Sequence, residues 1–413
     1  METVSVRKNA LNILNRIVYQ HGYASLILRS TQTNYDERDQ ALLSEIVYGT
    51  MRNLQYLEYQ WQPLAKRPVQ HRTALLLDMS VYQLLFLDRI PSYAVVDEAV
   101  DLAEERDKKF VNAVLRSVQR QPVREADKKD ILEKTAIMTS HPLWLMKLWD
   151  SHYGTDTAVK IAEHDQKSAV VYGRVNTLKC SIEKAASFPG VHMLEDGCFT
   201  YDGILSGTKM MKNGLVLIQD RASQKVARFL DVKQGMSVLD CCAAPGTKTI
   251  QTAALMNNTG SIVACDQTET RVRLIQDLCR RTGVKNCSAI IRDASKPDAS
   301  MKEKSFDSIL VDAPCSGLGD LSHKPEIRLH ITPQDIDTLC ELQRKILNNS
   351  AMYLKKDGIL VYSTCTLNRK ENENQIQKFL KQNPDFRLND EKTCFPFEED
   401  SDGFYMAQLQ RTE

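Results

Sequence analysis

The stretch Met236–Thr249, MSVLDCCAAPGTKT, decides the fold of this chain. A short, mostly apolar run ends at Asp240, and small residues with one Pro-Gly pair then lead into a Lys-Thr pair and a further apolar stretch. This order predicts a strand, a tight loop and a helix. Open α/β sheets bind nucleotide-like ligands at such a loop, although an ordinary strand-to-helix connection has the same order.

The loop lacks two phosphate-binding motifs. The Gly-x4-Gly-Lys spacing of a Walker loop is missing, and Gly246 stands alone where a dinucleotide fingerprint has three glycines. A ligand at this loop would therefore not be held through a phosphate cradle of either kind.

Length and composition restrict the class of protein. A chain of 413 residues is too long for one core, and 54 basic against 53 acidic residues give no charge excess that would indicate nucleic acid. Eleven cysteines without a C-x-x-C pair and eight scattered histidines predict reduced thiols and no metal site. No apolar run approaches the roughly 20 residues of a membrane helix, and no signal peptide is recognisable. We expect a cytoplasmic monomer that binds neither membrane nor metal.

The region before the loop divides into two parts. Residues 1–125 carry apolar stripes at helical spacing and predict an all-α domain. Its basic residues are either a solvated face or a phosphate-contacting stripe; they are Arg52, Lys66, Arg67, Arg72, Arg116, Arg120 and Arg124. After a charged linker, residues 138–220 predict a small α+β module. In it, Arg174–Asn176 is either a strand facing the substrate or a structural strand with a buried Asn.

From residue 221 to 413, strands and helices alternate as in a parallel sheet, which predicts a Rossmann-like α/β domain. Four successive strands end at or just before an acidic residue, and a fifth ends at a cysteine. These residues are Asp240, Asp266, Asp293, Asp312 and Cys365. Carboxylates gathered on one rim repel each other unless something uses them, so the rim is the candidate site.

The acids indicate the class of ligand. Asp266 follows Asp240 at the spacing at which an acid after a second strand meets a ribose diol, and Asp293 could meet an adenine amino group. This pattern fits S-adenosylmethionine (AdoMet) as well as a dinucleotide. The missing glycines favour AdoMet, because its methionine end needs no pyrophosphate cradle.

Two cysteines indicate the reaction. Cys315 lies in DAPCSG, after one predicted strand, and Cys365 lies in STCT, after another. Carbon 5 of a pyrimidine is a poor nucleophile, so its methylation requires a thiolate that adds to carbon 6. A lone cysteine is more often a buried inert thiol, but two on the ligand rim could supply a nucleophile and a second group.

The motifs DCCAAPGTKT, VDAPCSGLG, VYSTCTLNRKENE and DGFYMAQL together resemble the RNA 5-methylcytosine methyltransferases of the RsmB/Sun/Fmu family. RKNALNILNRIVYQHGYAS, SEIVYGTMRN and KKFVNAVLRSV resemble the NusB family of RNA-binding domains. Together the resemblances cover nearly the whole chain. They imply an AdoMet-dependent enzyme that methylates carbon 5 of a cytosine in 16S ribosomal RNA, with a NusB-like domain that binds or positions the RNA.

The resemblance also implies residue roles. Cys365 would be the nucleophile and Cys315 would assist breakdown of the covalent adduct. Asp266 would bind the ribose, Asp293 the adenine, and Asp312 would lie between cofactor and target base. The methionine part would be held by a loop of seven residues: Cys242, Ala243, Ala244, Pro245, Gly246, Thr247 and Lys248.

The chain departs from the family pattern at Thr247, where a second glycine is usual. A β-branched residue tolerates positive φ badly, so we expect extended or helical backbone there. Thr366, where serine is common, is a milder change.

Other functions are also compatible with parts of the sequence. A non-catalytic RNA-binding factor would be expected to have lost a cysteine or the rim acids. A DNA-type arrangement would make the cysteine after Pro314 the nucleophile, and a small-molecule methyltransferase would need neither the second cysteine nor the helical domain.

Overall fold

The computed structural model describes residues 5–31 and 35–413. The chain forms two compact units. The first comprises Met1–Ser168 with Leu321–His330, and the second comprises Ala169–Asp320 with Ile331–Glu413. The three domain ranges expected from the sequence stay a prediction, because a unit defined by packing can hold more than one module.

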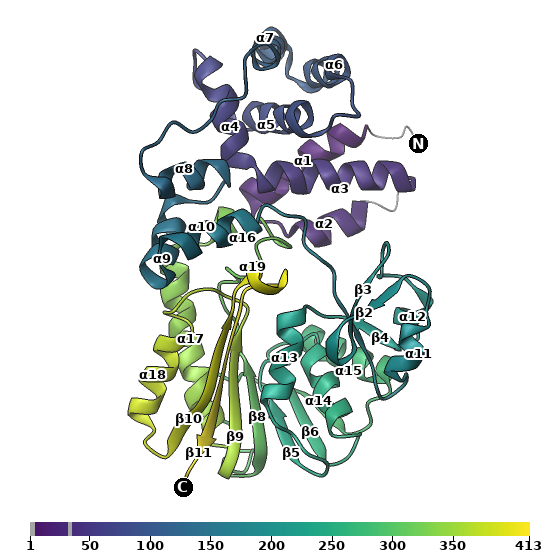
Figure 1. The fold of residues 1–413 in the computed structure, drawn as a ribbon, viewed down its shortest axis with the longest axis vertical. Helices are drawn as coiled ribbons and strands as arrows, with labels where there is room; N and C mark the ends of the chain where they lie inside the picture. Colours follow the sequence, from purple (N-terminus) through teal and green to yellow (C-terminus); the bar gives the residue numbers. More distant parts are fainter. Residues whose placement is uncertain (1–4, 32–34) are drawn as a thin grey trace. The chain divides into compact units, whose positions relative to one another are not determined.

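The first unit is helical throughout (Figure 1). Asp36 caps the third helix by accepting a hydrogen bond from Asp39 N. Apolar stripes from several helices meet in one core, in which every residue from Leu75 to Gln83 is buried. The helices are α1 (Val6–Gln20), α2 (Ala24–Thr31), α3 (Glu37–Arg52), α4 (Leu54–Trp61), α5 (His71–Phe86), α6 (Ser92–Leu102), α7 (Lys108–Arg120), α8 (Ile131–Met138), α9 (Leu143–Tyr153) and α10 (Thr155–His164).

A segment from late in the chain, Leu321–His330 with α16 (Ile327–His330), packs into this helical unit. Arg328 is 1% exposed and donates to the carbonyl oxygens of Thr139 (3.0 Å) and Arg52 (2.6 Å). Arg52 itself is partly buried and donates to Ser322 O at 3.2 Å. Arg52 therefore contributes to packing, in contrast to the exposed phosphate contact considered for it.

The second unit begins with a small antiparallel sheet of order β2-β3-β1-β4. The predicted strand at Arg174 is confirmed. The elements are β1 (Gly173–Val175), α11 (Ile182–Ala186), β2 (Val191–Met193), β3 (Cys198–Tyr201), α12 (Lys209–Lys212) and β4 (Val216–Ile218).

A seven-stranded sheet of order β10-β11-β9-β8-β5-β6-β7 follows. Its strands are β5 (Ser237–Asp240), β6 (Ser261–Asp266), β7 (Cys287–Ile291), β8 (Phe306–Asp312), β9 (Leu354–Thr364), β10 (Phe386–Cys394) and β11 (Phe404–Arg411). The first five strands are parallel, and β11 pairs antiparallel with both β9 and β10. The strand order reverses between β5 and β8, and ligands of open α/β sheets bind at such a switch point.

Helices cover both faces of this sheet (Figure 1). One face carries α13 (Arg221–Phe229), α14 (Thr247–Leu255) and α15 (Glu269–Thr282), and the other carries α17 (Pro333–Ala351) and α18 (Glu373–Gln382). α17 ends at Ala351, and Leu354, which pairs with Phe306, starts β9. Within the described ranges, no helix has the length and apolar character needed to cross a membrane.

Candidate active site

The loop after β5 turns directly into a helix. Gly246 has a φ of +109°, a left-handed conformation that favours glycine, and α14 begins at the next residue. Thr247 therefore takes helical backbone, one of the two conformations expected for it. Ala243 N donates to Cys265 O (2.9 Å) and Ala244 N donates to Asp266 Oδ2 (3.1 Å), which ties the loop to the end of β6.

The rim acids hold defined contacts. Asp266 is 5% exposed, and its Oδ1 accepts from Arg271 Nε at 2.6 Å. Asp293 accepts from Ser295 Oγ at 2.6 Å and from Gln267 Nε2 at 3.3 Å. The hydrogen bond from Ser295 holds the pKa of Asp293 at about 2. Both side chains thus lie at the carboxyl ends of neighbouring strands, as predicted.

Asp240 is a buried carboxyl at the end of β5. Its Oδ2 accepts from Thr249 Oγ1 at 2.7 Å, whereas its Oδ1 is buried without a hydrogen-bond partner in the described part of the chain. Burial raises the pKa of Asp240 from 3.8 to about 7. The folded state therefore binds this proton more tightly than the unfolded chain does.

Asp240→Asn should remove part of the pH dependence of stability. The stabilisation from this proton is complete below the unfolded pKa and is lost as pH rises through about 7, costing about 2 to 3 kcal/mol between pH 5 and 8. Urea unfolding at both pH values should show a larger loss for the wild type than for the variant. Equal losses in the two proteins would contradict the assignment.

Lys248 and Asp312 form a partly buried ion pair. Lys248 Nζ lies 2.7 Å from Asp312 Oδ2, and Ser363 Oγ donates to Asp312 Oδ1 at 2.8 Å. Burial lowers the pKa of Lys248, but the Asp312 carboxylate outweighs this and the pKa is raised. The amine also lies 5.2 Å from the centre of the Phe404 ring. The first turn of α14 is thereby joined to the ends of β8 and β9.

The two predicted cysteines lie together. The sulfurs of Cys315 and Cys365 are 3.4 Å apart, and both residues are partly buried. Cys315 follows β8 and Cys365 follows β9, which are adjacent parallel strands. The hydrogen bond to Cys365, followed by burial, raises the pKa of the Cys315 thiol well above its usual value. This arrangement can supply two sulfur groups to one reacting ring.

Arg174 and Asn176 are buried within the second unit. Arg174 is 4% exposed and donates to Gln219 Oε1 (2.6 Å) and to Thr247 O (3.0 Å). Asn176 donates to Gly214 O and Thr282 O. These contacts match a structural strand with a buried Asn, and they add a link to the first turn of α14 that no sequence pattern indicated.

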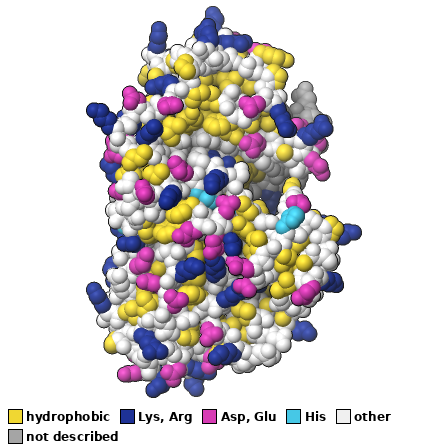
Figure 2. All heavy atoms as spheres, in the orientation of Figure 1, with side chains coloured by type: hydrophobic (Ala, Val, Ile, Leu, Met, Phe, Trp, Pro, Cys, Tyr) yellow, Lys and Arg dark blue, Asp and Glu magenta, His cyan; other side chains and the backbone are white. Residues whose placement is uncertain are grey.

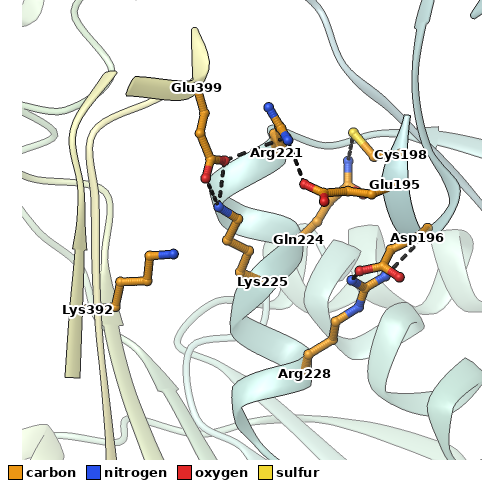
Figure 3. A pocket seen from close by; sticks show the side chains of 9 residues that line it. All are labelled: Glu195, Asp196, Cys198, Arg221, Gln224, Lys225, Arg228, Lys392 and Glu399. Carbon is orange, nitrogen blue, oxygen red and sulfur yellow. Dashed lines mark hydrogen bonds and ion pairs between the residues drawn. The ribbon is translucent and has the colours of Figure 1, made fainter. Parts of the chain in front are cut away.

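A separate pocket of about 320 Å³ lies in the second unit (Figure 3). Arg221 and Lys225 both turn toward Glu399, and Arg228 turns toward Asp196. Lys392 extends into the pocket without a partner among the residues drawn. Because the charges are mostly paired and no predicted catalytic residue lines it, this pocket is distinct from the thiol site. On the face drawn in Figure 2, basic and acidic side chains are likewise interspersed.

Models of known protein families match the chain in three regions. Residues 4–120 match the NusB family, and residues 141–187 match a ferredoxin-like domain of RsmF/B-like methyltransferases. Residues 227–410 match the family described as 16S rRNA methyltransferase RsmB/F.

Named relatives extend over almost the full length. The probable ribosomal RNA small subunit methyltransferase B of Bacillus subtilis (strain 168) is 39% identical over 404 residues, 94% of this chain and 90% of that protein. The chain belongs to the RsmB/F family. Ribosomal RNA small subunit methyltransferase B of Vibrio cholerae is 33% identical to this family member over 99% of the chain and 98% of its own length. The resemblance inferred from the sequence is confirmed.

Solved structures share the fold of this RsmB/F methyltransferase. PH0851 has a TM-score of 0.82 at 24% identity and covers 98% of this chain and 99% of its own. A methyltransferase homolog from Pyrococcus horikoshii has a TM-score of 0.61 at 28% identity, with 69% and 100% covered. NSun6 from Pyrococcus horikoshii, solved with SFG, has a TM-score of 0.59 at 23% identity, with 66% and 98% covered. The predicted fold class, a helical NusB-like domain, a small module and a Rossmann-like methyltransferase domain, is confirmed.

Proposed function

We propose that this RsmB/F methyltransferase transfers a methyl group from AdoMet to carbon 5 of one cytosine in 16S rRNA, through a covalent bond between Cys365 and carbon 6. The observation that carries the proposal is the pair of sulfurs, 3.4 Å apart at the ends of adjacent strands. A thiol that adds to a pyrimidine needs a second group close by for the later release of the base, and Cys315 lies at that position.

The residues on the rim fit AdoMet, which when bound supplies a methyl group on a positively charged sulfur. Among the described residues, Asp266 Oδ2 accepts one hydrogen bond, from Ala244 N, so a lone pair is left for a ribose hydroxyl. Asp293 would bind the adenine, and the loop Cys242–Lys248 would hold the methionine part. Asp312, fixed by Lys248 and Ser363, would lie between the cofactor and the target base.

Cys365 acts as the nucleophile. Its sulfur adds to carbon 6 of a cytosine taken out of its stack, and carbon 5 becomes electron-rich enough to take the methyl group. Carbon 5 then loses its proton to the Cys315 thiolate, the bond between carbon 6 and the Cys365 sulfur breaks, and the ring double bond is restored. Cys315 suits this task because its sulfur lies 3.4 Å from that of Cys365 and so can reach the same ring.

Two further assignments accompany this proposal. We place the enzyme in the cytoplasm as a monomer, with residues 1–125 as the NusB-like domain, 138–220 as the RNA-positioning module and 221–413 as the catalytic domain. The exposed side chains of Arg116 and Arg120 on α7 are candidates for phosphate contact by the helical domain.

The direct test is methyl transfer from labelled AdoMet to bare 16S rRNA from cells that lack this protein, read by bisulfite sequencing. We expect one newly protected cytosine with the wild-type enzyme and none with a preparation of the Cys365→Ala variant. Intact AdoMet binding without any protected site would overturn the substrate assignment and direct the search to other RNAs.

A further inference from the structure

A fully buried carboxylate lies behind the two cysteines. Glu371, in the turn before α18, is 0% exposed. Its Oε1 accepts from Ser316 N (2.9 Å) and Gln343 Nε2 (2.9 Å). Its Oε2 accepts from Ser316 Oγ (2.5 Å) and Asn368 Nδ2 (3.0 Å). Both oxygens are thus used only as acceptors, toward four donors.

The donors connect the two loops that carry the thiols. Ser316 directly follows Cys315, and its hydroxyl lies 2.7 Å from the hydroxyl of Thr366, which directly follows Cys365. Leu318 N also donates to Thr366 Oγ1, at 3.3 Å. The two cysteine loops are therefore joined through buried polar groups as well as through their strands.

The same network holds the other side of Cys315. Gln343, from α17, donates to Pro314 O at 3.0 Å while it donates to Glu371. The residues before and after Cys315 are thus both bonded to one group of buried side chains. Removing a buried acceptor leaves its donors without a partner, which costs more than the bond itself contributed.

We propose that Glu371 is a positioning residue whose carboxylate sets the distance and orientation between the Cys315 and Cys365 sulfurs. The inference rests on the proposed function, because the separation of the sulfurs matters only if both act on one base. A carboxylate suits this position because it offers two acceptor oxygens and no donor. In a glutamine, an amide nitrogen in the place of Oε2 would face Ser316 Oγ and Asn368 Nδ2 as a donor. The Ser316 hydroxyl can turn to accept this hydrogen bond, but the Asn368 amide nitrogen cannot accept one.

The first test measures the sulfur pair without RNA or cofactor. The full chain, as wild type, Glu371→Gln and Glu371→Ala, is treated with diamide, which is reduced to its hydrazine as the two thiols are oxidised to a disulfide. Mass spectrometry of digests follows the Cys315–Cys365 crosslink against time. We expect slowing of about ten-fold or more in Glu371→Ala, because a displacement of roughly 1 Å can cost about 10²-fold in rate at reacting groups. The slowing should be smaller in Glu371→Gln.

Matched variants separate positioning from loss of the fold. Glu341→Gln changes an exposed glutamate of α17 and should crosslink at the wild-type rate. Ser316→Ala keeps the backbone bond to Glu371 but loses the hydroxyl that bridges to Thr366, so it should slow the crosslink even where Glu371→Ala does not fold. The folded variants of Glu371 and Ser316 should unfold at a lower midpoint than wild type, because buried donors lose an acceptor, but they should keep the wild-type AdoMet affinity.

The second test is catalytic. In Glu371→Gln, kcat for rRNA methylation should fall with KM for AdoMet unchanged, and a covalent protein–RNA species should accumulate because Cys315 is displaced from the adduct. Crosslinking and kcat both within two-fold of wild type in Glu371→Gln and Ser316→Ala would overturn the positioning role. If the variants crosslink more slowly but the wild-type enzyme methylates no rRNA, the positioning role of Glu371 stands and the proposed function is overturned.

Discussion

Cys365→Ala is expected to abolish methyl transfer to rRNA, with a fall in rate of at least roughly 10⁴-fold, since removal of a covalent nucleophile leaves only binding and positioning. Without the sulfur, carbon 5 of the cytosine is not activated, whatever the placement of the methyl donor. Transfer of label from AdoMet to rRNA, followed over hours, measures the loss. The same assay should detect no covalent protein–RNA species.

Two controls show whether the loss of activity comes from the Cys365 sulfur itself. AdoMet affinity should be unchanged, because the residues proposed to hold the cofactor lie at or after the ends of β5, β6 and β7, and Cys315 and Cys365 are not among them. Cys287→Ala removes another partly buried thiol, on β7, and should retain activity. Turnover by Cys365→Ala within ten-fold of wild type would overturn the assignment of Cys365 as the nucleophile.

The parallel sheet could be predicted because its signal is local. Each central strand is a short apolar run that ends at a polar residue, and parallel strands place their carboxyl ends on one rim. Asp240, Asp266 and Asp312 therefore reached one edge of the sheet without any knowledge of strand order. The same argument placed Cys315 and Cys365 on this rim, and the structure shows that their strands β8 and β9 are neighbours, with the sulfurs 3.4 Å apart.

The contacts that complete the site could not be predicted, because they join residues far apart in sequence. The family resemblance assigned Lys248 to the cofactor loop, and its amine pairs with Asp312, 64 positions later. Glu371 belongs to a motif that carried the resemblance, but three of its four donors come from Ser316 and Gln343, which lie 55 and 28 positions earlier. The spacing of apolar residues along the sequence does not report contacts between residues so far apart.

The helical unit shows the same limit. Its stripes predicted the helices, but nothing local marks Leu321–His330 as part of their packing. The buried Arg328 of this segment donates a hydrogen bond to the carbonyl oxygen of Arg52, a residue considered for phosphate contact. Tertiary packing thus decided the role of a basic side chain that composition alone left open.

Cys315→Ala is expected to give the opposite result to Cys365→Ala: a covalent protein–RNA species that accumulates. The Cys365 sulfur still adds to carbon 6 and the methyl group is still transferred, but the group that takes the carbon 5 proton is gone. Release should slow by on the order of 10² to 10⁴, the usual contribution of a positioned acid–base group. With labelled rRNA, the species should appear as a slowly migrating band on a denaturing gel.

The double variant Cys315→Ala with Cys365→Ala should show no band. Loss of the band on adding Cys365→Ala to Cys315→Ala shows that the Cys365 sulfur carries the bond to the RNA. A band in Cys365→Ala but not in Cys315→Ala would assign the nucleophile to Cys315, as in the DNA-type arrangement, and reverse both roles. The sulfurs are too close for their positions to settle this, because each lies at the end of a neighbouring strand and either could reach one ring. The gel therefore assigns the two roles, because a covalent species forms only in a variant that keeps the nucleophilic sulfur.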